Sequence, residues 1–421
     1  MFKIRLPRIF FGWWIVIASF ITTLYVGGII VYGFTAIFEP LLEEFQWSYT
    51  QISLAASIRG LETGILAPVF GLMVDRWGPR KLIFSGIIVT ALGLLLISQV
   101  NSLPMFYLAF IITSVGMSAC SMTVPMTAIA HWFKRKLGLA MGIAVSGFGF
   151  SGLLIPLIVK LIDSYGWRTA LDILALGMIV LILPLSLVFR HKPEQYGYSP
   201  DDEAEATSSP TSDGNHKPDA KAAFGLKQAL RNKAFWYISL AFTYHALAIN
   251  AVVIHVMPYL SSLGFARSFS SMIAAAIPLT SIIGRLGIGW FSDKTNRKHI
   301  AAAAFIMIAL GILCFGFTTI SKQWLIILFL ILVGIGYGGT NSLRPALVSE
   351  YFGRANFGAI IGFVIGINML GNFAGPPVAG WVFDSWGSYR GIWVVFAGLG
   401  LLATLLIINI PRPEKRHQQN I

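Results

Sequence analysis

Long runs of apolar residues constrain this chain more than any other feature of its sequence. A helix that crosses a bilayer takes about 20 predominantly apolar residues. Twelve stretches meet this requirement, at 12–38, 50–73, 82–100, 105–130, 138–162, 169–189, 235–261, 269–291, 300–319, 324–349, 357–382 and 391–410. Their continuity excludes a transmembrane barrel, whose strands show short alternating segments. The sequence therefore predicts an all-α membrane protein with twelve transmembrane helices.

The charge distribution agrees with this prediction. Only 12% of the residues are charged, too few to cover a water-soluble surface, and the net charge is +13. Most of the 31 Lys and Arg residues fall in the two termini, the central loop and every second connection between spans. The alternate loops hold only Arg168, Arg267, Lys322 and Arg390. This asymmetry follows the positive-inside rule, so we expect both termini in the cytoplasm, a plasma-membrane location (the inner membrane in a bacterium), and no nucleic-acid partner.

A polar segment divides the predicted spans into two groups of six. Residues 191–233 are rich in Ser, Pro, Asp and Lys, apart from a short amphipathic stretch at 224–231. We expect this segment to be a cytoplasmic linker whose amphipathic helix lies on the membrane surface. The predicted domains are thus an N-terminal six-helix half at 1–190, the linker at 191–233, and a C-terminal six-helix half at 234–421.

The two halves repeat the same motifs in register. The Gly-x-x-x-Asp pattern at 71–81 returns at 289–298, and the aromatic and basic motif at 131–135 returns at 350–354. Several matches at one displacement indicate an internal duplication. Two related six-helix halves predict a transporter whose halves rock around a binding site near the middle of the membrane.

These motifs resemble those of the major facilitator superfamily, and the resemblance covers essentially the whole chain. The Gly-x-x-x-Asp-Arg-x-Gly-x-Arg-Lys loop is the most specific signature of that family. Its charged residues there hold helix ends together and control gating. The resemblance therefore implies a gating role for Asp75, Arg76, Arg80 and Asp293.

Finer features resemble the monocarboxylate transporter branch and its bacterial relatives, which include oxalate–formate exchangers. The resemblance is carried by Phe11-Gly-Trp-Trp14, by the motif from His131 to Gly142, by His255-x-Met-Pro-Tyr259-Leu, and by Gly284-Arg285. That branch binds the substrate carboxylate through an arginine at the position of Arg285. The resemblance implies a secondary transporter for a small monocarboxylate.

The chain departs from this branch at three places. Tyr32 stands where animal members have a lysine, and Ser281 stands where they have an aspartate, so proton coupling through those two groups is not implied. The oxalate exchangers have a second cation in the eleventh span, whereas residues 357–382 contain no Lys or Arg. This difference weakens a dicarboxylate hypothesis.

Arg285 is the first candidate for substrate binding on physical grounds as well. A charge inside a spanning helix costs several kcal/mol unless it meets a partner or a cavity. A guanidinium stays protonated, and its planar fork matches a carboxylate. The structural alternative is an ion pair with a carboxylate such as Glu62. We expect Arg285 to bind the substrate carboxylate.

Tyr337, Asn368 and Tyr32 are candidates for contacts with the rest of the substrate. At 1.5 Å per residue, Tyr337 and Asn368 come out at about the same depth as Arg285. Their hydroxyl and amide groups suit a small hydroxy or keto acid. Polar residues of this kind also join neighbouring spanning helices, and this alternative stays open.

Three residues are candidates for proton coupling. Arg59 and Glu62 lie three residues apart on one helix and share a face, so they form a structural ion pair or make Glu62 a proton acceptor. Histidine titrates near neutral pH, so His255 either carries the proton or orients the substrate. The sequence leaves these alternatives open.

Two further polar residues receive structural interpretations. His245 lacks motif support, and we expect it to be a packing residue. Arg344 lies near the inner end of its span, where we expect it to extend to the membrane surface or to pair with Glu350 or Asp293.

The resulting hypothesis is a monomeric secondary transporter that moves a lactate- or pyruvate-like monocarboxylate together with a proton. We expect no cofactor, because the proton gradient drives transport and the sequence lacks a nucleotide-binding motif. The alternatives are an organic-anion exchanger, an exporter of another small solute, and a membrane sensor. An enzyme is disfavoured, because no motif assembles a nucleophile with a base.

Overall fold

A computed structural model describes residues 10–120, 123–133, 136–191, 193–196, 226–353 and 357–411. Within these ranges only the backbone is described for Thr63, Ala67, Pro68, Asp75 and Asp293. Most of the predicted linker, at 197–225, lies outside the described residues. So do the side chains of two predicted gating residues, Asp75 and Asp293.

The chain divides into two compact units that differ slightly from a simple split into halves. Unit 1 comprises Met1–Phe45 with Glu62–Gly214, and unit 2 comprises Gln46–Leu61 with Asn215–Ile421. Unit 1 contains helices α1 (Gly12–Val26), α2 (Phe34–Phe45), α4 (Pro79–Ser98), α5 (Leu103–Cys120), α6 (Thr123–Trp132), α7 (Leu137–Phe150), α8 (Leu154–Tyr165) and α9 (Trp167–Gly177). Unit 2 contains α10 (Leu226–Arg231), α11 (Lys233–Ser262), α12 (Arg267–Lys294), α13 (Arg297–Gly316), α14 (Trp324–Phe352), α15 (Phe357–Trp386) and α16 (Arg390–Ile408). Helix α3 (Tyr49–Trp77) begins in unit 2 and continues into unit 1.

The predicted all-α membrane fold is confirmed. Eleven helical stretches in the described part of the chain are long and apolar enough to cross a membrane. The first of them, Gly12–Phe45, joins α1 and α2 through a π-helical segment at Gly27–Tyr32. Helix α3, which is 29 residues long, corresponds to the second of the twelve predicted spans. It is not among the eleven because Arg59 and Glu62 lower its hydropathy. The chain is therefore a multi-pass membrane protein.

Many large apolar side chains remain exposed on the spanning helices. Leu72, Leu176, Leu286 and Leu370 all have more than half of their surface exposed, at 71%, 62%, 71% and 63%. Such exposure would be unfavourable in water and is expected where the surrounding solvent is lipid.

In unit 1, α4 packs against α5 and α9, and α1 packs against α7. The motif at 71–81 spans the end of α3, the turn at Gly78 and the start of α4. Gly78 adopts a φ of 79°, which favours glycine, and Pro79 then begins α4 in the first-turn position that suits proline. Arg76 and Arg80 are exposed on either side of this turn.

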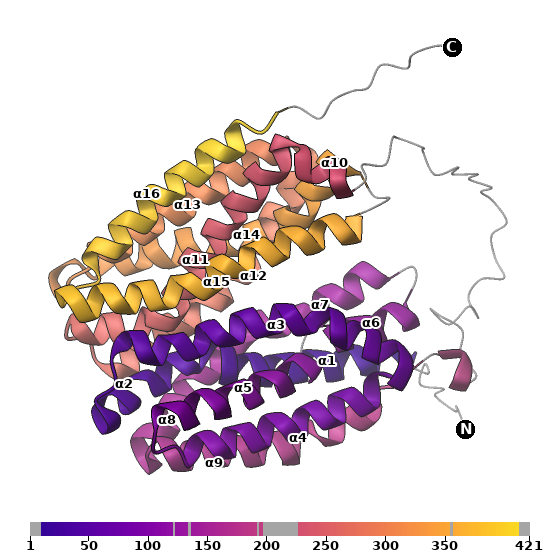
Figure 1. Cartoon of the computed structure of the whole chain (residues 1–421), viewed down its shortest axis with the longest axis horizontal. Coiled ribbons are helices and arrows are strands. Elements are labelled where there is room, and N and C mark those ends of the chain that lie inside the picture. The colour runs from indigo at the N-terminus through magenta and orange to yellow at the C-terminus, as the bar shows by residue number, and fades with distance from the viewer. Residues whose placement is uncertain are drawn as a thin grey trace, which may run out of the picture. The chain divides into compact units, whose positions relative to one another are not determined.

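Unit 2 is built around α11, which packs mainly against α15 and α16 (Figure 1). Helix α14 packs against α12 and α13. An aromatic cluster fills one end of the unit, where Phe315 lies 4.1 Å from Phe329 and 4.6 Å from Tyr259 between ring centroids. At the start of α13, the Asn296 side chain accepts a hydrogen bond from the Lys298 amide and caps the helix.

Candidate functional site

Arg285 lies in the second half of α12, where this helix meets α14. Its side chain is half-buried, and its Nε atom is buried without a hydrogen-bond partner among the described residues. No carboxylate of the described chain forms an ion pair with its guanidinium. Since a guanidinium stays charged and a charge within the membrane requires a partner, this arginine suits an anionic ligand.

A close contact between α12 and α14 fixes the level of Arg285. Gly338 makes this contact possible, because a Cβ there would clash with the Ser281 carbonyl oxygen and lie 2.8 Å from the Arg285 amide nitrogen. The Ser342 hydroxyl donates a hydrogen bond of 3.3 Å to the Arg285 carbonyl. Arg285 therefore lies level with residues 338–342 of α14, directly after the predicted site residue Tyr337.

Tyr337 belongs to a half-buried polar cluster between α11 and α14. The His245 ring stacks on the Tyr337 ring at a centroid distance of 5.8 Å and an angle of 24°. Asn341, one turn after Tyr337, donates a hydrogen bond of 3.1 Å to the Tyr337 carbonyl. The Arg344 guanidinium donates to the Asn341 side-chain oxygen at 2.9 Å. Neither His245 nor Arg344 was predicted to belong to the site.

Of the two expected partners of Arg344, Asp293 has no described side chain and Glu350 is paired elsewhere. Glu350, one of its two predicted partners, pairs instead with Arg297 at 3.8 Å. The Arg344 side chain reaches back along α14, and its guanidinium lies 5.7 Å from the centre of the Phe242 ring. The expectation of a pair with Glu350 was wrong, because helical side chains lean toward the N-terminus of their helix.

Asn368 lies on α15 and is 2% exposed. Its side-chain oxygen accepts a hydrogen bond of 3.3 Å from the Thr243 hydroxyl of α11. Its Nδ2 is enclosed and has no partner within the described chain. Unit 2 thus presents several buried polar atoms without a described hydrogen-bond partner, on α11, α12 and α15.

His255 lies apart from these residues. Its Nε2 is 2.9 Å from the Pro376 carbonyl oxygen, and its Nδ1 is 2.8 Å from the Tyr389 hydroxyl. A carbonyl oxygen only accepts, so Nε2 carries a hydrogen and the neutral ring accepts the Tyr389 hydrogen at Nδ1. Pro376 is eight residues from Asn368, or about 12 Å along a helix. The structure therefore places His255 in a link between α11, α15 and the start of α16.

The remaining candidates lie on α3 and in unit 1. Tyr32 is 3% exposed and ends the π-helical segment, a helix type often found at functional sites. Arg59 is 5% exposed in the part of α3 that belongs to unit 2. Glu62 is half-buried and begins the part that belongs to unit 1.

The first turn of α3 is capped from a distant helix. The Asp384 carboxylate of α15 accepts hydrogen bonds of 2.9 Å from the Tyr49 amide and 2.9 Å from the Thr50 amide. It also accepts a bond of 2.6 Å from the Thr50 hydroxyl. A carboxylate is favoured at a helix N-terminus because the amide groups there lack partners within the helix.

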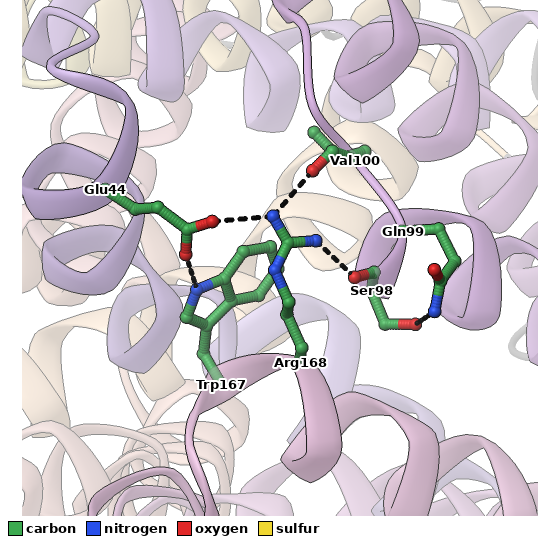
Figure 2. A network of polar contacts seen from close by, with 6 residues as sticks. All are labelled: Glu44, Ser98, Gln99, Val100, Trp167 and Arg168. Carbon is green, nitrogen blue, oxygen red and sulfur yellow. Dashed lines mark hydrogen bonds and ion pairs between the residues drawn. The ribbon is translucent and has the colours of Figure 1, made fainter.

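A second arginine network lies at one end of unit 1 (Figure 2). Arg168 donates to the Ser98 carbonyl at 2.5 Å, the Val100 carbonyl at 2.8 Å and the Glu44 carboxylate at 2.6 Å. The other Glu44 oxygen accepts a bond of 2.6 Å from the Trp167 indole. This network joins the ends of α2, α4 and α9. Because its charges are matched within the protein, we assign it a structural role.

The sequence contained one signal for the missed residues. Tyr337, Asn341 and Arg344 stand at i, i+4 and i+7 and so share one face of α14. The stacking of His245 on that face had no comparable signal.

The described residues include no group of three His, Cys, Asp or Glu side chains that could hold a metal ion.

Comparison with known proteins agrees with this architecture. The chain is 23% identical over 421 residues to "Monocarboxylate transporter 12" of Xenopus laevis, a match that covers 97% of this chain and 90% of that protein. It is 24% identical over 406 residues to "Monocarboxylate transporter 13" of Bos taurus, with 94% and 89% covered. Among solved structures, a bacterial homolog of the human lysosomal transporter Spinster has the same fold, with a TM-score of 0.67, 16% identity, and 94% and 95% of the two chains covered.

The family model described as Major Facilitator Superfamily matches residues 11–318 and 256–421. The two matches together reach from α1 to the C-terminus, and the curated relatives are membrane transporters, not enzymes. The chain therefore belongs to the major facilitator superfamily, with relatives in its monocarboxylate transporter branch.

Proposed function

We propose that this chain is a secondary transporter that moves a lactate- or pyruvate-like monocarboxylate together with a proton by alternating access. In this proposal Arg285 binds the substrate carboxylate, and Tyr337, Asn368 and Tyr32 contact the rest of the molecule. The chain is a membrane transporter of the major facilitator superfamily. The substrate, the coupled proton, the monomeric state and a cytoplasmic location of both termini belong to the proposal.

The state of Arg285 is the observation that carries the proposal. Its guanidinium has no carboxylate partner among the described side chains, and its Nε is enclosed without an acceptor. A carboxylate supplies both the missing charge and the acceptor geometry of the planar fork. The names of the curated relatives support a monocarboxylate as the ligand.

The partners of His255 favour Glu62 as the group that exchanges the proton. Both ring nitrogens of His255 already have hydrogen-bond partners, Pro376 and Tyr389, so the ring takes up a proton at Nδ1 only when the Tyr389 hydroxyl turns from donor to acceptor. Glu62 is a half-buried carboxylate in the spanning helix α3. A carboxylate that picks up a proton as the substrate binds would keep the membrane region from holding an uncompensated charge.

The experiment is uptake of radiolabelled L-lactate into proteoliposomes, with and without an inward acid gradient. Wild type is compared with Arg285→Ala, Arg285→Lys and the control Lys322→Gln, which removes an exposed positive charge from the connection between α13 and α14. We expect the gradient to accelerate uptake by the wild type and the control. Arg285→Ala should lower uptake at least about 100-fold, the loss expected for a desolvated charged contact of about 3 kcal/mol.

Other outcomes would redirect the proposal in defined ways. Wild-type uptake of lactate that needs internal anion instead of an acid gradient would establish the exchanger alternative. Full activity of Arg285→Ala in a well-folded preparation would remove Arg285 from the binding site. Loss of gradient-driven uptake in Glu62→Gln, with anion exchange retained, would assign the proton to Glu62.

A further inference from the structure

The first spanning helix holds one residue more than a regular α-helix, between two anchored points. Its π-helical segment, Gly27–Tyr32, lies between α1 and α2. A π-helical hydrogen bond joins residues i and i+5 instead of i and i+4, so the segment contains an extra residue. Just before it, the Tyr25 hydroxyl donates a hydrogen bond of 2.9 Å to the Leu174 carbonyl of α9. Beyond it, near the end of α2, Glu44 is bound by Arg168. The extra residue is therefore enclosed between two fixed ends.

Glycine residues set the present place of the extra residue. A Cβ at Gly33 would lie 2.5 Å from the Gly28 carbonyl oxygen and 2.7 Å from the Ile29 carbonyl oxygen. A Cβ at Gly28 would lie 2.9 Å from the Ser151 carbonyl oxygen. Larger residues at either position would force the backbone to shift, so the glycines favour the π-helical winding here.

Pro40 marks a second place that favours the extra residue. It lies in the interior of α2. A proline there removes a backbone hydrogen bond, and its ring crowds the carbonyl oxygen four residues earlier, at Ala36. A π-helical turn is wound more widely and moves that carbonyl away from the ring. The same helix thus has two favourable places for one extra residue.

A small cavity lies beside the stretch between these two places. Its volume is about 20 Å³, enough for one water molecule, and its lining is almost entirely apolar. Ile29, Ile30 and Phe34 line it from this stretch, and side chains of α4, α5 and α9 line the other sides. Protein interiors are close-packed, so side chains turn most easily where such free volume exists. The cavity gives this room to the stretch that follows the π-helical segment.

We propose that the extra residue moves between Gly27–Tyr32 and Pro40 during transport, and that this movement turns Tyr32 from one face of the helix to another. The residues between the two places turn by about 100° and shift by about 1.5 Å along the axis, the values for one residue of an α-helix. Tyr25 and Glu44 stay in place. Tyr32 is 3% exposed in the present position, and the turn presents it to the substrate. This contact rests on the proposed function, whereas the movement does not depend on which solute is carried.

Two deletions trap the two positions. Deletion of Ile29 removes the extra residue at its present place and keeps Tyr32 as it is. Deletion of Ile37 removes it near Pro40 and leaves Tyr32 turned. Both keep the ends of the helix in register, so we expect both proteins to fold, with melting temperatures within about 5 °C of wild type. The control is deletion of Leu92 in the regular helix α4, which turns all later residues of α4 by about 100° and should prevent folding.

Transport and binding separate the trapped proteins from wild type. Uptake of L-lactate into proteoliposomes should fall at least about 10-fold in both deletion variants, because a conformational step is blocked. L-lactate should still stabilise the Ile37 deletion against heat, and adding Tyr32→Phe should weaken that stabilisation. In the Ile29 deletion Tyr32→Phe should have no effect on it.

A substitution at Pro40 tests the same movement without a deletion. Pro40→Ala removes the second favourable place, so the extra residue should stay at Gly27–Tyr32 and turnover should fall in the folded protein. Pro104→Ala is the matched control. It replaces an exposed proline in the first turn of α5, where proline is tolerated, and should transport like wild type.

Hydrogen exchange supplies a readout that needs no substrate. The amides of residues 29–37 should exchange at least about 10-fold faster in wild type than in Pro40→Ala, because the movement breaks their hydrogen bonds. Exchange in α5 should not change.

The outcomes separate this inference from the proposed function. Equal exchange in wild type and Pro40→Ala, or wild-type uptake by a folded deletion variant, would overturn the movement. Unfolding of the Ile37 deletion would do the same, because the turned arrangement would then not be a stable one. The expected difference in exchange, in a wild type that takes up no lactate, would support the movement and overturn the proposed substrate.

Discussion

Arg168 in unit 1 and Arg344 in unit 2 differ in how their guanidinium groups are partnered. Arg168 donates to two backbone carbonyls and a carboxylate, and its guanidinium lies 4.5 Å from the centre of the Trp167 ring. Arg344 donates to one amide oxygen and lies 5.7 Å from the centre of the Phe242 ring. The first arrangement is complete without a ligand, whereas the second includes no carboxylate among the described side chains. An arginine with matched partners stabilises a fold, whereas an unmatched one in a membrane helix indicates a binding function.

Removal of Arg168 should have the largest effect on stability. Arg168→Met leaves the Glu44 carboxylate and two carbonyl oxygens without their donor. Hydrogen bonds to charged groups contribute about 1.5–3 kcal/mol each, and partial exposure of this pair reduces the total, so we expect a loss of about 2 kcal/mol. Thermal unfolding of the purified protein measures it. The control Lys160→Met removes an exposed charge of the same unit and should have little effect. Equal stability of both variants would contradict the structural role of Arg168.

Removal of Arg344 should change the stability in the opposite direction. Arg344→Met replaces a half-buried charge that lacks a described carboxylate partner with an apolar side chain of similar length. Substitution of poorly compensated buried charges by apolar residues is often neutral or stabilising. We expect a gain of about 1 kcal/mol in the same unfolding experiment, together with impaired transport. A loss of stability as large as that of Arg168→Met would show that Arg344 has a structural partner, and would remove the contrast between the two arginines.

The sequence predicted the fold well because hydropathy responds to the membrane directly. Runs of apolar residues, their number and the repeated loop motifs required no knowledge of tertiary contacts. The place of Arg285 within a spanning helix was also predictable, since a charge in the middle of an apolar run is conspicuous. The expected pair of Arg344 with Glu350 was wrong for a physical reason: the Arg344 Cα lies near the helix end, but its side chain leans back by about one turn to Asn341.

Contacts between helices distant in sequence were not predictable. His255 carries a motif and titrates near neutrality, which suggested proton transfer, yet nothing in the sequence showed that both of its nitrogens meet Pro376 and Tyr389. The stacking of His245 on Tyr337 and the Asp384 cap on α3 depend on which helix faces pack together. Periodicity specifies that a face exists, but it does not specify its neighbour.

The Asp384 cap lies between the two arginines in this respect. Both of its carboxylate oxygens accept hydrogen bonds, but the carboxylate is exposed. Asp384→Asn keeps an oxygen for one amide of α3 and removes the charge that interacts with the helix N-terminus. We expect a loss of about 1 kcal/mol, as found for other N-caps. Hydrogen exchange at the Tyr49 and Thr50 amides should accelerate, while exchange in the middle of α14 should not change. Thr50→Val, which removes only the hydroxyl bond of 2.6 Å, should have a smaller effect on the same amides.

The smallest effect should come from Trp167→Phe, which divides the Arg168 network into its parts. Phenylalanine keeps an aromatic face for the Arg168 guanidinium but loses the indole N–H that donates to Glu44. Glu44 still accepts from Arg168, so its carboxylate remains partnered and the expected loss is about 0.5 kcal/mol. In the double variant with Arg168→Met, the indole bond should become more important, because it is then the remaining described donor to Glu44. A cycle of the two single variants and the double variant measures this coupling. Strict additivity would mean that the two donors act on Glu44 independently, and that the network is a set of separate contacts instead of one unit.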